Sequence, residues 1–319
     1  MKLWQLLAGV PLTGEPYSQE MEITSISYDT RTLLPGALFV ALPGAKTDGS
    51  LYIDEALAKG AAAVVCRRRP QREGVFFTTP DPRRALALLA ENWFGHPGRE
   101  MTLIGVTGTN GKTTTTALTG EIMRHFFNSV FVVGNIGDPY TAHARETTEE
   151  SVTVAEVSSF QLETIMEFHP NVSAITNITP DHLDRHKTMD CYIQVKEGIA
   201  RNQTEEDSCV LNYDDPELRA FGSTLKSKVI YFSRREKLDQ GVYMDGDRIV
   251  YRHGGKTEPV LDVKDLQIIG GHNHENVMTA VAISLQMGVP IPVIREACMA
   301  FKAVEHRIEF VRERFGVTY

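Results

Sequence analysis

Long apolar runs are missing from the 319-residue chain, and none approaches the roughly 20 residues that a helix needs to span a bilayer. The N-terminus carries Lys2 but has no sustained apolar segment followed by a small-residue cleavage site. These absences predict a protein that is neither exported nor anchored and that does not act on a membrane.

Cysteine is scarce, and no two cysteines stand in the CxxC spacing of metal and redox sites. The four cysteines are Cys66, Cys191, Cys209 and Cys298. Small secreted domains are stapled by a much denser disulfide framework. We therefore expect reduced thiols and a cytoplasmic protein.

An excess of positive charge is also missing, because 33 basic residues face 41 acidic ones and the formal net charge is -8. An acidic protein gains nothing from neutralising nucleic-acid phosphates, so no nucleic-acid partner is expected. The one basic run, Arg67-Arg68-Arg69, is followed by Pro70 and is typical of a solvated loop. A hydrophobic fraction of 42% and a charged fraction of 23% indicate a globular protein.

The length allows two domains. Residues 36–43 have the pattern of a short buried strand, and residues 52–65 that of a helix-like segment. Residues 81–94 have the apolar spacing of an amphipathic helix, and the breaker cluster at 95–98 follows them. A domain boundary near residue 98 is therefore expected.

After this boundary, an apolar strand over 101–106 leads into a glycine-rich loop, and a helix is expected over 114–127. Further short apolar runs occur at 130–133, 152–157, 172–178, 208–211 and 229–232. Strands that alternate with helical stretches predict an α/β protein with a mostly parallel, doubly wound sheet. The segments around Asp245-Gly246 predict a hairpin appended to that sheet.

The glycine-rich loop has the character of a phosphate-binding loop, and it reads Gly108-Thr109-Asn110-Gly111-Lys112-Thr113-Thr114. Backbone N–H groups at such a loop and the following helix N-terminus converge on phosphate oxygens. Lys112 would neutralise phosphate charge, and the Thr113 hydroxyl would bind magnesium. The general pattern fails at one position, because it needs glycine where Val106 stands. A polar turn that caps a helix is the alternative.

Polar residues follow the next strands at the same sheet edge. Glu156 ends the strand over 152–157, where a carboxylate can serve magnesium, although a glutamate there can equally be an ordinary loop residue. His182 and His186 are four residues apart, which on a helix would also suit zinc. A zinc peptidase would need glutamate where Leu183 stands. Lys196, taken alone, is an ordinary solvated helix lysine.

Together these motifs resemble the Mur ligase family, the ATP-dependent ligases that build the peptide stem of peptidoglycan. Residues 108–114 are similar to the family's short GTNGKT[T/S] loop, which explains Val106. The run Glu156-Val157-Ser158-Ser159-Phe160-Gln161-Leu162-Glu163 resembles the member that adds D-glutamate. Residues 134–137 and 177–186 are similar to the same member.

The resemblance implies roles for individual residues. It implies catalytic roles for Lys112, Glu156, His182 and Lys196. It implies two magnesium ions held by Thr113, Glu156, His182 and a carbamate that forms on Lys196. It implies ATP contacts by Gly108, Thr109, Asn110, Gly111, Lys112, Thr113 and Thr114. It places Asn135 and Ser158 on the substrate side.

Two later motifs also resemble the family. Residues 270–276 are similar to its adenine-side motif, which implies that Asn273 and Asn276 lie near the base of ATP. Residues 305–309 are similar to its hinge motif, which implies that Arg307 reaches the nucleotide phosphates.

The first domain resembles a different branch of the family. Residues 24–49 are similar to the UDP-binding domain of the ligases that add the third stem residue or the dipeptide, and Ser27, Thr30 and Arg31 become substrate candidates. The family's third domain has no counterpart before Tyr319. The expected domains are a UDP-sugar-binding domain over 1–98, an ATP-binding central domain over 99–304, and over 305–319 the hinge and the start of a C-terminal domain.

The implied function is ligation of D-glutamate to UDP-N-acetylmuramoyl-L-alanine through an acyl phosphate, by a monomer with ATP and magnesium. Three alternatives stay open at this point. They are a ligase that adds the third stem residue, a non-catalytic module that binds a nucleotide or UDP-sugar, and a general phosphate-loop NTPase with a mechanical or signalling role.

Overall fold

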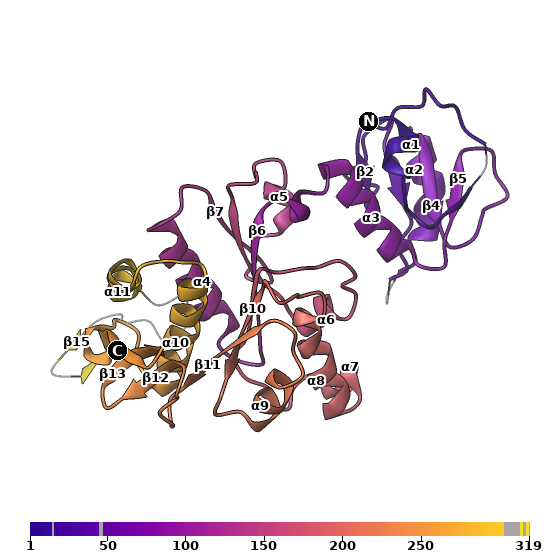
Figure 1. Ribbon diagram of the computed structural model, residues 1–319. Helices are drawn as coiled ribbons and strands as arrows, with labels where there is room; N and C mark the ends of the chain where they lie inside the picture. Colours follow the sequence, from indigo (N-terminus) through magenta and orange to yellow (C-terminus); the bar gives the residue numbers. More distant parts are fainter. Residues whose placement is uncertain (15, 45–46, 303–312, 315–316, 319) are drawn as a thin grey trace. The chain divides into compact units, whose positions relative to one another are not determined.

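A computed structural model describes residues 1–14, 16–44, 47–302, 313–314 and 317–318. The chain forms two compact units, Met1–Arg99 and Glu100–Tyr319 (Figure 1). The division lies beside the breaker cluster at residues 95–98 from which a boundary is expected. Each unit is described by itself below.

The first unit contains a five-stranded sheet. In spatial order its strands are β1 (Thr13–Gly14), β5 (Phe76–Thr78), β4 (Ala63–Cys66), β3 (Leu38–Val40) and β2 (Ile26–Ser27). Neighbouring strands are parallel except for β1 and β5, which are antiparallel. The helices are α1 (Leu3–Leu6), α2 (Ile53–Ala58) and α3 (Pro82–Phe94), with 3-10 turns at Gly49–Tyr52 and Pro97–Arg99.

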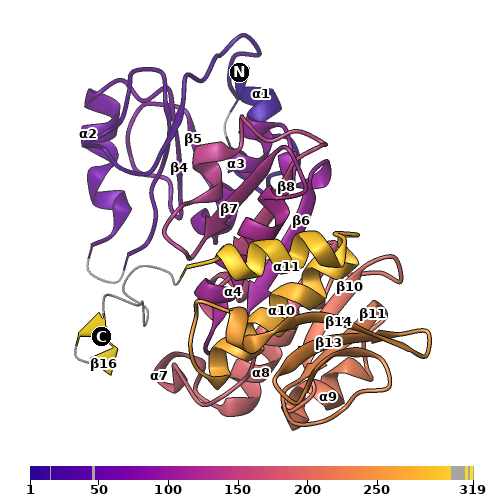
Figure 2. The same ribbon diagram turned by 90° about the vertical axis from the view of Figure 1, so that its left-hand side faces the viewer.

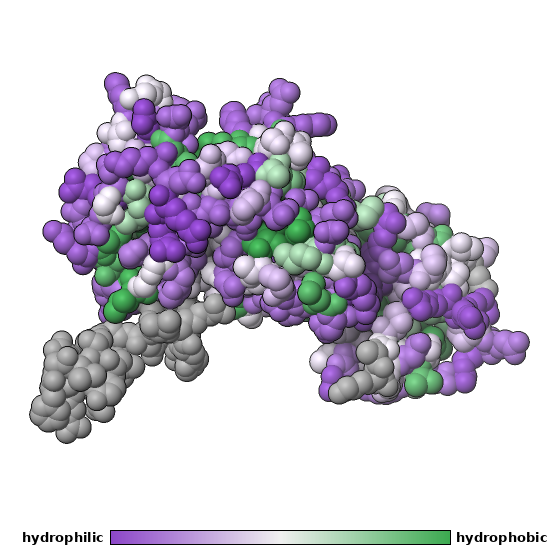
Figure 3. Space-filling model, turned by 90° about the horizontal axis from the view of Figure 1, so that it is seen from below, coloured by the Kyte–Doolittle hydropathy of each residue, from purple (hydrophilic) through white to green (hydrophobic). Residues whose placement is uncertain are grey.

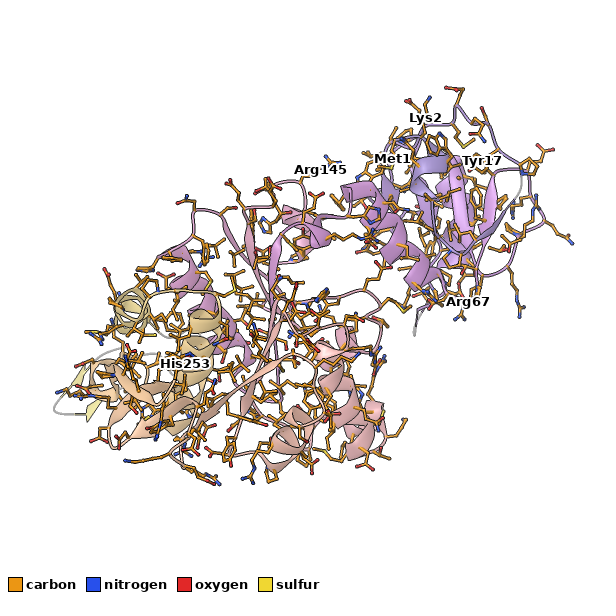
Figure 4. All side chains as sticks on the ribbon, viewed as in Figure 1. Met1, Lys2, Tyr17, Arg67, Arg145 and His253 are labelled. Atoms are coloured by element: carbon orange, nitrogen blue, oxygen red, sulfur yellow. The ribbon has the colours of Figure 1, made fainter. Side chains whose placement is uncertain are left out.

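Helices cover both faces of this sheet, and alternate residues of β3 and β4 accordingly lie in two different hydrophobic clusters. Leu38 and Val65 pack in the cluster that includes residues of α1 and α3, whereas Phe39 and Val64 pack in the cluster that includes residues of α2. Tyr17 of this unit is labelled in Figure 4, and its ring packs edge to face on that of Phe77 in β5, with ring centres 5.6 Å apart.

The predicted helix over 81–94 is confirmed with its caps. The Asp81 side chain accepts a hydrogen bond from the N–H of Arg84 at 3.1 Å, and Gly95 ends the helix at a φ of 78°. The prediction of a helix-like segment over 52–65 is correct only as far as Ala58. Gly60 turns the chain at a φ of 87°, and the apolar run that follows is the buried strand β4.

The second unit contains a nine-stranded sheet. Its strands, in spatial order, are β14 (Lys256–Asp262), β13 (Arg248–His253), β12 (Gly241–Asp245), β11 (Lys228–Ser233), β10 (Ser208–Asn212), β9 (Val172–Ile175), β6 (Thr102–Thr107), β8 (Val152–Glu156) and β7 (Val130–Gly134). All neighbours from β12 to β7 are parallel, which confirms the mostly parallel sheet. The hairpin at Asp245-Gly246 is confirmed as β12–β13, and β14 extends it.

Helices of the second unit form a layer on each face of the sheet (Figures 1 and 2). They are α4 (Lys112–Arg124), α5 (Tyr140–His143), α6 (Ser159–Leu162), α7 (Leu183–His186), α8 (Met189–Glu197), α9 (Pro216–Gly222), α10 (Gly271–Gln286) and α11 (Ile291–Ala300), with 3-10 turns at Gly198–Ala200 and Val263–Asp265. Ile104 of β6 packs in the cluster that contains residues of α4, α10 and α11. Its neighbour Leu103 packs in the cluster that contains residues of α6, α8 and α9.

The described part of the chain ends in a short antiparallel pair, β15 (Glu313–Arg314) and β16 (Val317–Thr318). The predicted hinge residue Arg307 lies outside the described residues. None of the described helices is both long and apolar enough to cross a bilayer. The face shown in Figure 3 is mostly hydrophilic, with small, separate hydrophobic patches.

Candidate nucleotide and metal site

The glycine-rich loop connects β6 to the N-terminus of α4, and two of its glycines are required by their surroundings. Gly108 has a φ of 145° and Gly111 a φ of 80°, which other residues rarely adopt. A Cβ atom on Gly108 would lie 2.0 Å from Oγ1 of Thr176, and one on Gly111 would lie 2.1 Å from Oδ1 of Asn276. The loop therefore packs too closely for any side chain at these positions.

The segment that follows β9 holds the loop in shape. The N–H of Asn110 donates to Oδ1 of Asn177 at 2.9 Å, and Nδ2 of Asn177 donates to the Asn110 carbonyl at 3.2 Å. Oγ1 of Thr176 donates to the same carbonyl at 2.6 Å. Sequence reasoning did not assign these two supports, although the carboxyl ends of parallel strands meet at one sheet edge.

Thr109 connects the loop to a second segment. Its hydroxyl accepts from the N–H of Thr179 at 3.0 Å and lies 3.1 Å from the hydroxyl of Tyr192. Its carbonyl accepts from Nζ of Lys112 at 2.8 Å. Lys112 is the first residue of α4, so its charge adds to the positive end of the helix dipole. The loop thus has the geometry and charge of an anion-binding site.

Thr113 and Thr114 follow in the first turn of α4, half-buried and buried respectively. Their position agrees with the expected phosphate and magnesium contacts, which stay predictions.

The N-terminal turns of α10 lie against the loop. Oγ1 of Thr115 in α4 donates to Oδ1 of Asn276 at 3.4 Å. Nδ2 of Asn276 donates to Oδ1 of Asn273 at 3.0 Å, and Nδ2 of Asn273 donates to the Ile269 carbonyl at 2.8 Å. The structure therefore brings both predicted adenine-side residues to the loop. A contact with the base stays a prediction.

Glu156 ends β8, the strand next to β6, and its side chain is only 1% exposed. Oε1 accepts from Nδ2 of Asn135 at 2.9 Å, and the Asn135 N–H donates to the Glu156 carbonyl at 2.9 Å. Oε2 is buried and has no hydrogen-bond partner among the described residues. A buried carboxylate oxygen without a partner is costly, and a cation would relieve that cost. The glutamate thus fits the expected magnesium.

Lys196 of α8 is 1% exposed, so it is not the solvated lysine that its sequence context suggests. Its Nζ donates to the Gly108 carbonyl at 2.7 Å and lies 4.8 Å from the centre of the Tyr192 ring. Burial, with repulsion from Lys112, lowers the pKa of Lys196 to about 7, and Asp181 opposes this shift. The structure therefore brings this lysine to the phosphate loop, and its carbamylation stays a prediction.

His182 and His186 face different surroundings. His182 precedes α7 with a left-handed φ of 51°, and its side chain is 48% exposed with Nε2 3.5 Å from Oδ2 of Asp181. His186 is buried. In the described part of the chain no three His, Cys, Asp or Glu side chains gather as a metal site, so the zinc alternative gains no support. The predicted magnesium ligands are of a different kind, because they include a threonine and a lysine carbamate.

Ser158 caps the N-terminus of α6 through a capping box. Its Oγ accepts from the Gln161 N–H at 3.3 Å, and Oε1 of Gln161 accepts from the Ser158 N–H at 2.8 Å. The capping fixes Ser158 two residues after Glu156, at the same sheet edge. Its substrate contact stays a prediction.

The substrate candidates of the first unit lie in the turn after β2. Oγ of Ser27 donates to the Asp29 carbonyl at 2.9 Å, and Nζ of Lys59 donates to the Thr30 carbonyl at 2.8 Å. Arg31 forms an ion pair with Asp29, which lowers the pKa of that carboxyl to about 2. The Arg31 side chain is 86% exposed. The turn thus presents a preorganised cation, and its binding of UDP stays a prediction.

Two known family models match the chain. The model described as Mur ligase middle domain matches residues 106–284. The model described as Mur ligase family, catalytic domain, matches residues 22–92.

Among curated relatives, a UDP-N-acetylmuramoylalanine--D-glutamate ligase of Lachnoclostridium phytofermentans is 54% identical over 217 residues, which are 68% of this chain and 48% of the relative. One of the same name from Clostridioides difficile is 50% identical over 216 residues, with 68% and 48% covered. The chain thus spans about half the length of the curated relatives it matches.

Solved structures agree with the fold. A crystal structure of MurF from Acinetobacter baumannii has a TM-score of 0.73 at 20% identity, covering 98% of this chain and 70% of that one. MurF ligase from Thermotoga maritima in complex with ADP has a TM-score of 0.69 at 22% identity, covering 92% and 69%.

Proposed function

Because the chain belongs to the Mur ligase family, we propose that it works in an ATP-dependent, ADP-forming ligase that joins D-glutamate to UDP-N-acetylmuramoyl-L-alanine. The match over residues 106–284 and the names of the similar relatives support this proposal. The phosphate loop carries it physically, because its backbone, Lys112 and the start of α4 converge on one anion site. The neighbour that holds ADP supports ATP as the nucleotide.

The proposed reaction begins when the substrate carboxylate attacks the γ-phosphate of ATP, which releases ADP and forms an acyl phosphate. The amine of D-glutamate then attacks the acyl carbon, and phosphate and a proton leave as the amide forms. No protein nucleophile is needed, so positioning and electrostatics supply the catalysis. Lys112 would bind the transferred phosphoryl group. Asn273 and Asn276 would orient the nucleotide, and Asn135 and Ser158 the acceptor.

Two magnesium ions would shield the phosphate charge. Thr113, Glu156, His182 and a carbamate on Lys196 would hold them. The buried Oε2 of Glu156, which has no hydrogen-bond partner in the described part of the chain, supports a cation at this edge. Since the chain itself offers Lys196 with a pKa of about 7, a neutral amine is available there for reaction with carbon dioxide near neutral pH.

The first unit would bind the UDP-sugar end of the substrate through Ser27, Thr30 and Arg31. The exposed guanidinium of Arg31 supports a phosphate contact, because the Asp29 carboxylate already orients it. A cytoplasmic, monomeric protein is part of the same proposal. The cysteines agree with a cytoplasmic location, since all four are free thiols in the structure.

The test measures phosphate release from ATP by the complete protein that carries this sequence. Release should require both UDP-N-acetylmuramoyl-L-alanine and D-glutamate, and Lys112→Ala should abolish it. Release with a longer peptide substrate and a diamino acid, but not with this pair, would reassign the step. Binding of nucleotide or UDP-sugar without release under any pairing would favour a non-catalytic module.

A further inference from the structure

His186 is the buried end of a network that joins two short helices. Its side chain is 3% exposed, with Nε2 3.0 Å from Oγ of Ser159 and Nδ1 3.3 Å from Oε1 of Glu163. Its ring stacks on Phe160 with centres 5.8 Å apart, and it lies 5.2 Å from the ring of Tyr192. Both nitrogens of this histidine therefore lie near polar partners, and its ring contacts two aromatic side chains.

The polarity of the network follows from its charges. Arg185 donates to Glu163 at 2.6 Å and, ahead of any other cause, lowers the pKa of that carboxyl. The charged carboxylate can only accept, so Nδ1 of His186 carries the proton that faces it. Nε2 lies within hydrogen-bond distance of the Ser159 hydroxyl on the other side of the ring.

Helix α7 needs such ties because it has only four residues and is too short to be stable alone. It is also flanked by two non-glycine residues with positive φ, His182 at 51° and Lys187 at 71°. Such conformations persist only where the surrounding structure enforces them. In the described part of the chain, the bonds of His186 and Arg185 to α6 and its C-cap Glu163 are side-chain ties that do so.

A serine, a histidine and a glutamate in this order resemble the triad of a hydrolase, but burial argues against that role. Ser159 is 3% exposed, so its hydroxyl is not open to a substrate. The neighbouring Ser158 and His182, in contrast, border the network at the two helix starts and are half-buried and exposed.

We propose that His186 is a positioning residue, which locks α7 onto α6 so that His182 and Ser158 keep a fixed relation at the catalytic edge. The proposal rests on the proposed ligase function. The same contacts reach the phosphate loop, because Tyr192, whose ring centre lies 5.2 Å from that of His186, is within hydrogen-bond distance of Thr109.

The test compares His186→Phe, which keeps the ring packing and removes both nitrogens, with His186→Gln, which keeps an amide near Ser159. In the complete protein we expect His186→Phe to lower kcat at least 10-fold, to leave the KM for ATP within 2-fold, and to raise the magnesium concentration needed for half activity. His186→Gln should recover much of kcat. His169→Phe is the matched control, because His169 pairs with Asp207 at 2.7 Å outside the candidate site.

A readout without turnover accompanies the kinetics. In wild type, the ¹⁵N shift of Nδ1 of His186 should be that of a nitrogen that carries a proton. In His186→Phe, hydrogen exchange at the amides of residues 185–187 should accelerate, with no such change in His169→Phe. Unchanged kcat and magnesium dependence, or an Nδ1 without a proton, would overturn the positioning role alone. A wild-type protein that ligates none of the substrate pairs would instead overturn the proposed function.

Discussion

Lys196 and Lys112 donate to neighbouring carbonyls of the phosphate loop, at 2.7 Å to Gly108 and at 2.8 Å to Thr109. The two ammonium groups repel each other, which adds to the effect of burial on the pKa of Lys196. The loop thus holds one lysine that suits phosphate binding and one that loses its proton near neutral pH.

The lowered pKa of Lys196 predicts how stability depends on pH. Between about pH 7 and 10.5 the unfolded lysine keeps its proton while the folded one has lost it. Unfolding then takes up a proton, so the free energy of unfolding rises with pH through this window. Relative to Lys196→Met, wild type should gain at most about 5 kcal/mol on going from pH 7 to 10.5.

This difference is measured by urea unfolding of both proteins in buffers free of carbon dioxide, because a carbamate would change the charge of Lys196. The stability advantage of Lys196→Met should be largest at pH 7 or below and should shrink as the pH rises. A difference that does not vary with pH would mean that the lysine keeps its ordinary pKa.

Replacing Asn177 should weaken nucleotide binding. Asn177→Ala removes the side chain that both accepts from and donates to the Asn110 backbone, so the loop becomes less preorganised. We expect the Kd for ATP to rise about 10-fold, which corresponds to about 1.4 kcal/mol, as measured by calorimetric titration. Asn202→Ala is the control, since its amide donates to the Met166 and Phe168 carbonyls instead. Equal affinities of both variants would contradict the role of Asn177.

At Gly111, the effect of a steric clash can be separated from the effect of backbone strain. Gly111→Ala combines an unfavourable φ of 80° with a Cβ 2.1 Å from the Asn276 side chain. Gly246→Ala has a similar φ of 61° in the β12–β13 turn, but no atom lies within 4 Å of its Cβ. Both should lose about 1 kcal/mol of stability from strain. Only Gly111→Ala should also abolish ATP binding; if Gly246→Ala did so too, the clash would not be the cause.

Replacing Asn135 tests how much stability is lost when Glu156 has no amide donor. Asn135→Ala should lower the free energy of unfolding by about 1–2 kcal/mol, because Oε1 of the buried carboxylate then loses its hydrogen bond. Asn135→Asp should destabilise the protein more than Asn135→Ala at pH 7, since it places a second carboxyl group beside that of Glu156. Chemical denaturation at pH 7 and at pH 5 measures the free energy of unfolding of both variants. Equal stability of the two variants at pH 7 would count against this expectation.

The sequence predicted most of the fold because its local signals were strong. Apolar runs with polar ends predicted the strands of the parallel sheet, and the cap and breaker around 81–95 predicted α3. The helix over 52–65 was predicted too long, because an alanine-rich run suits both a helix and a buried strand. The turn at Gly60 and the pairing of β4 with both β3 and β5 decide between them.

For the site, sequence alone identified the loop but not the residues that support it. Thr176 and Asn177 support it from the segment that follows β9, which no spacing in the chain reveals. Lys196 is ordinary in the sequence, and its burial depends on packing between α8 and the loop. The family resemblance placed Lys196 at the site, and the structure supplies the physical reason. The spacing of His182 and His186 did not reveal that α7 starts after His182 and includes only His186.

The edge strand β14 is the place where a strand of another molecule could pair with the nine-stranded sheet. Among the described residues it forms one border of the nine-stranded sheet, where bare backbone groups would invite a foreign strand. Pro259 has no N–H to offer there, and Arg295 of α11 donates to the carbonyls of Pro259 and Val260. Lys256 adds a charge that a neighbouring strand would have to desolvate. Fewer backbone groups are thus open to a foreign strand at this border, which disfavours edge-to-edge pairing.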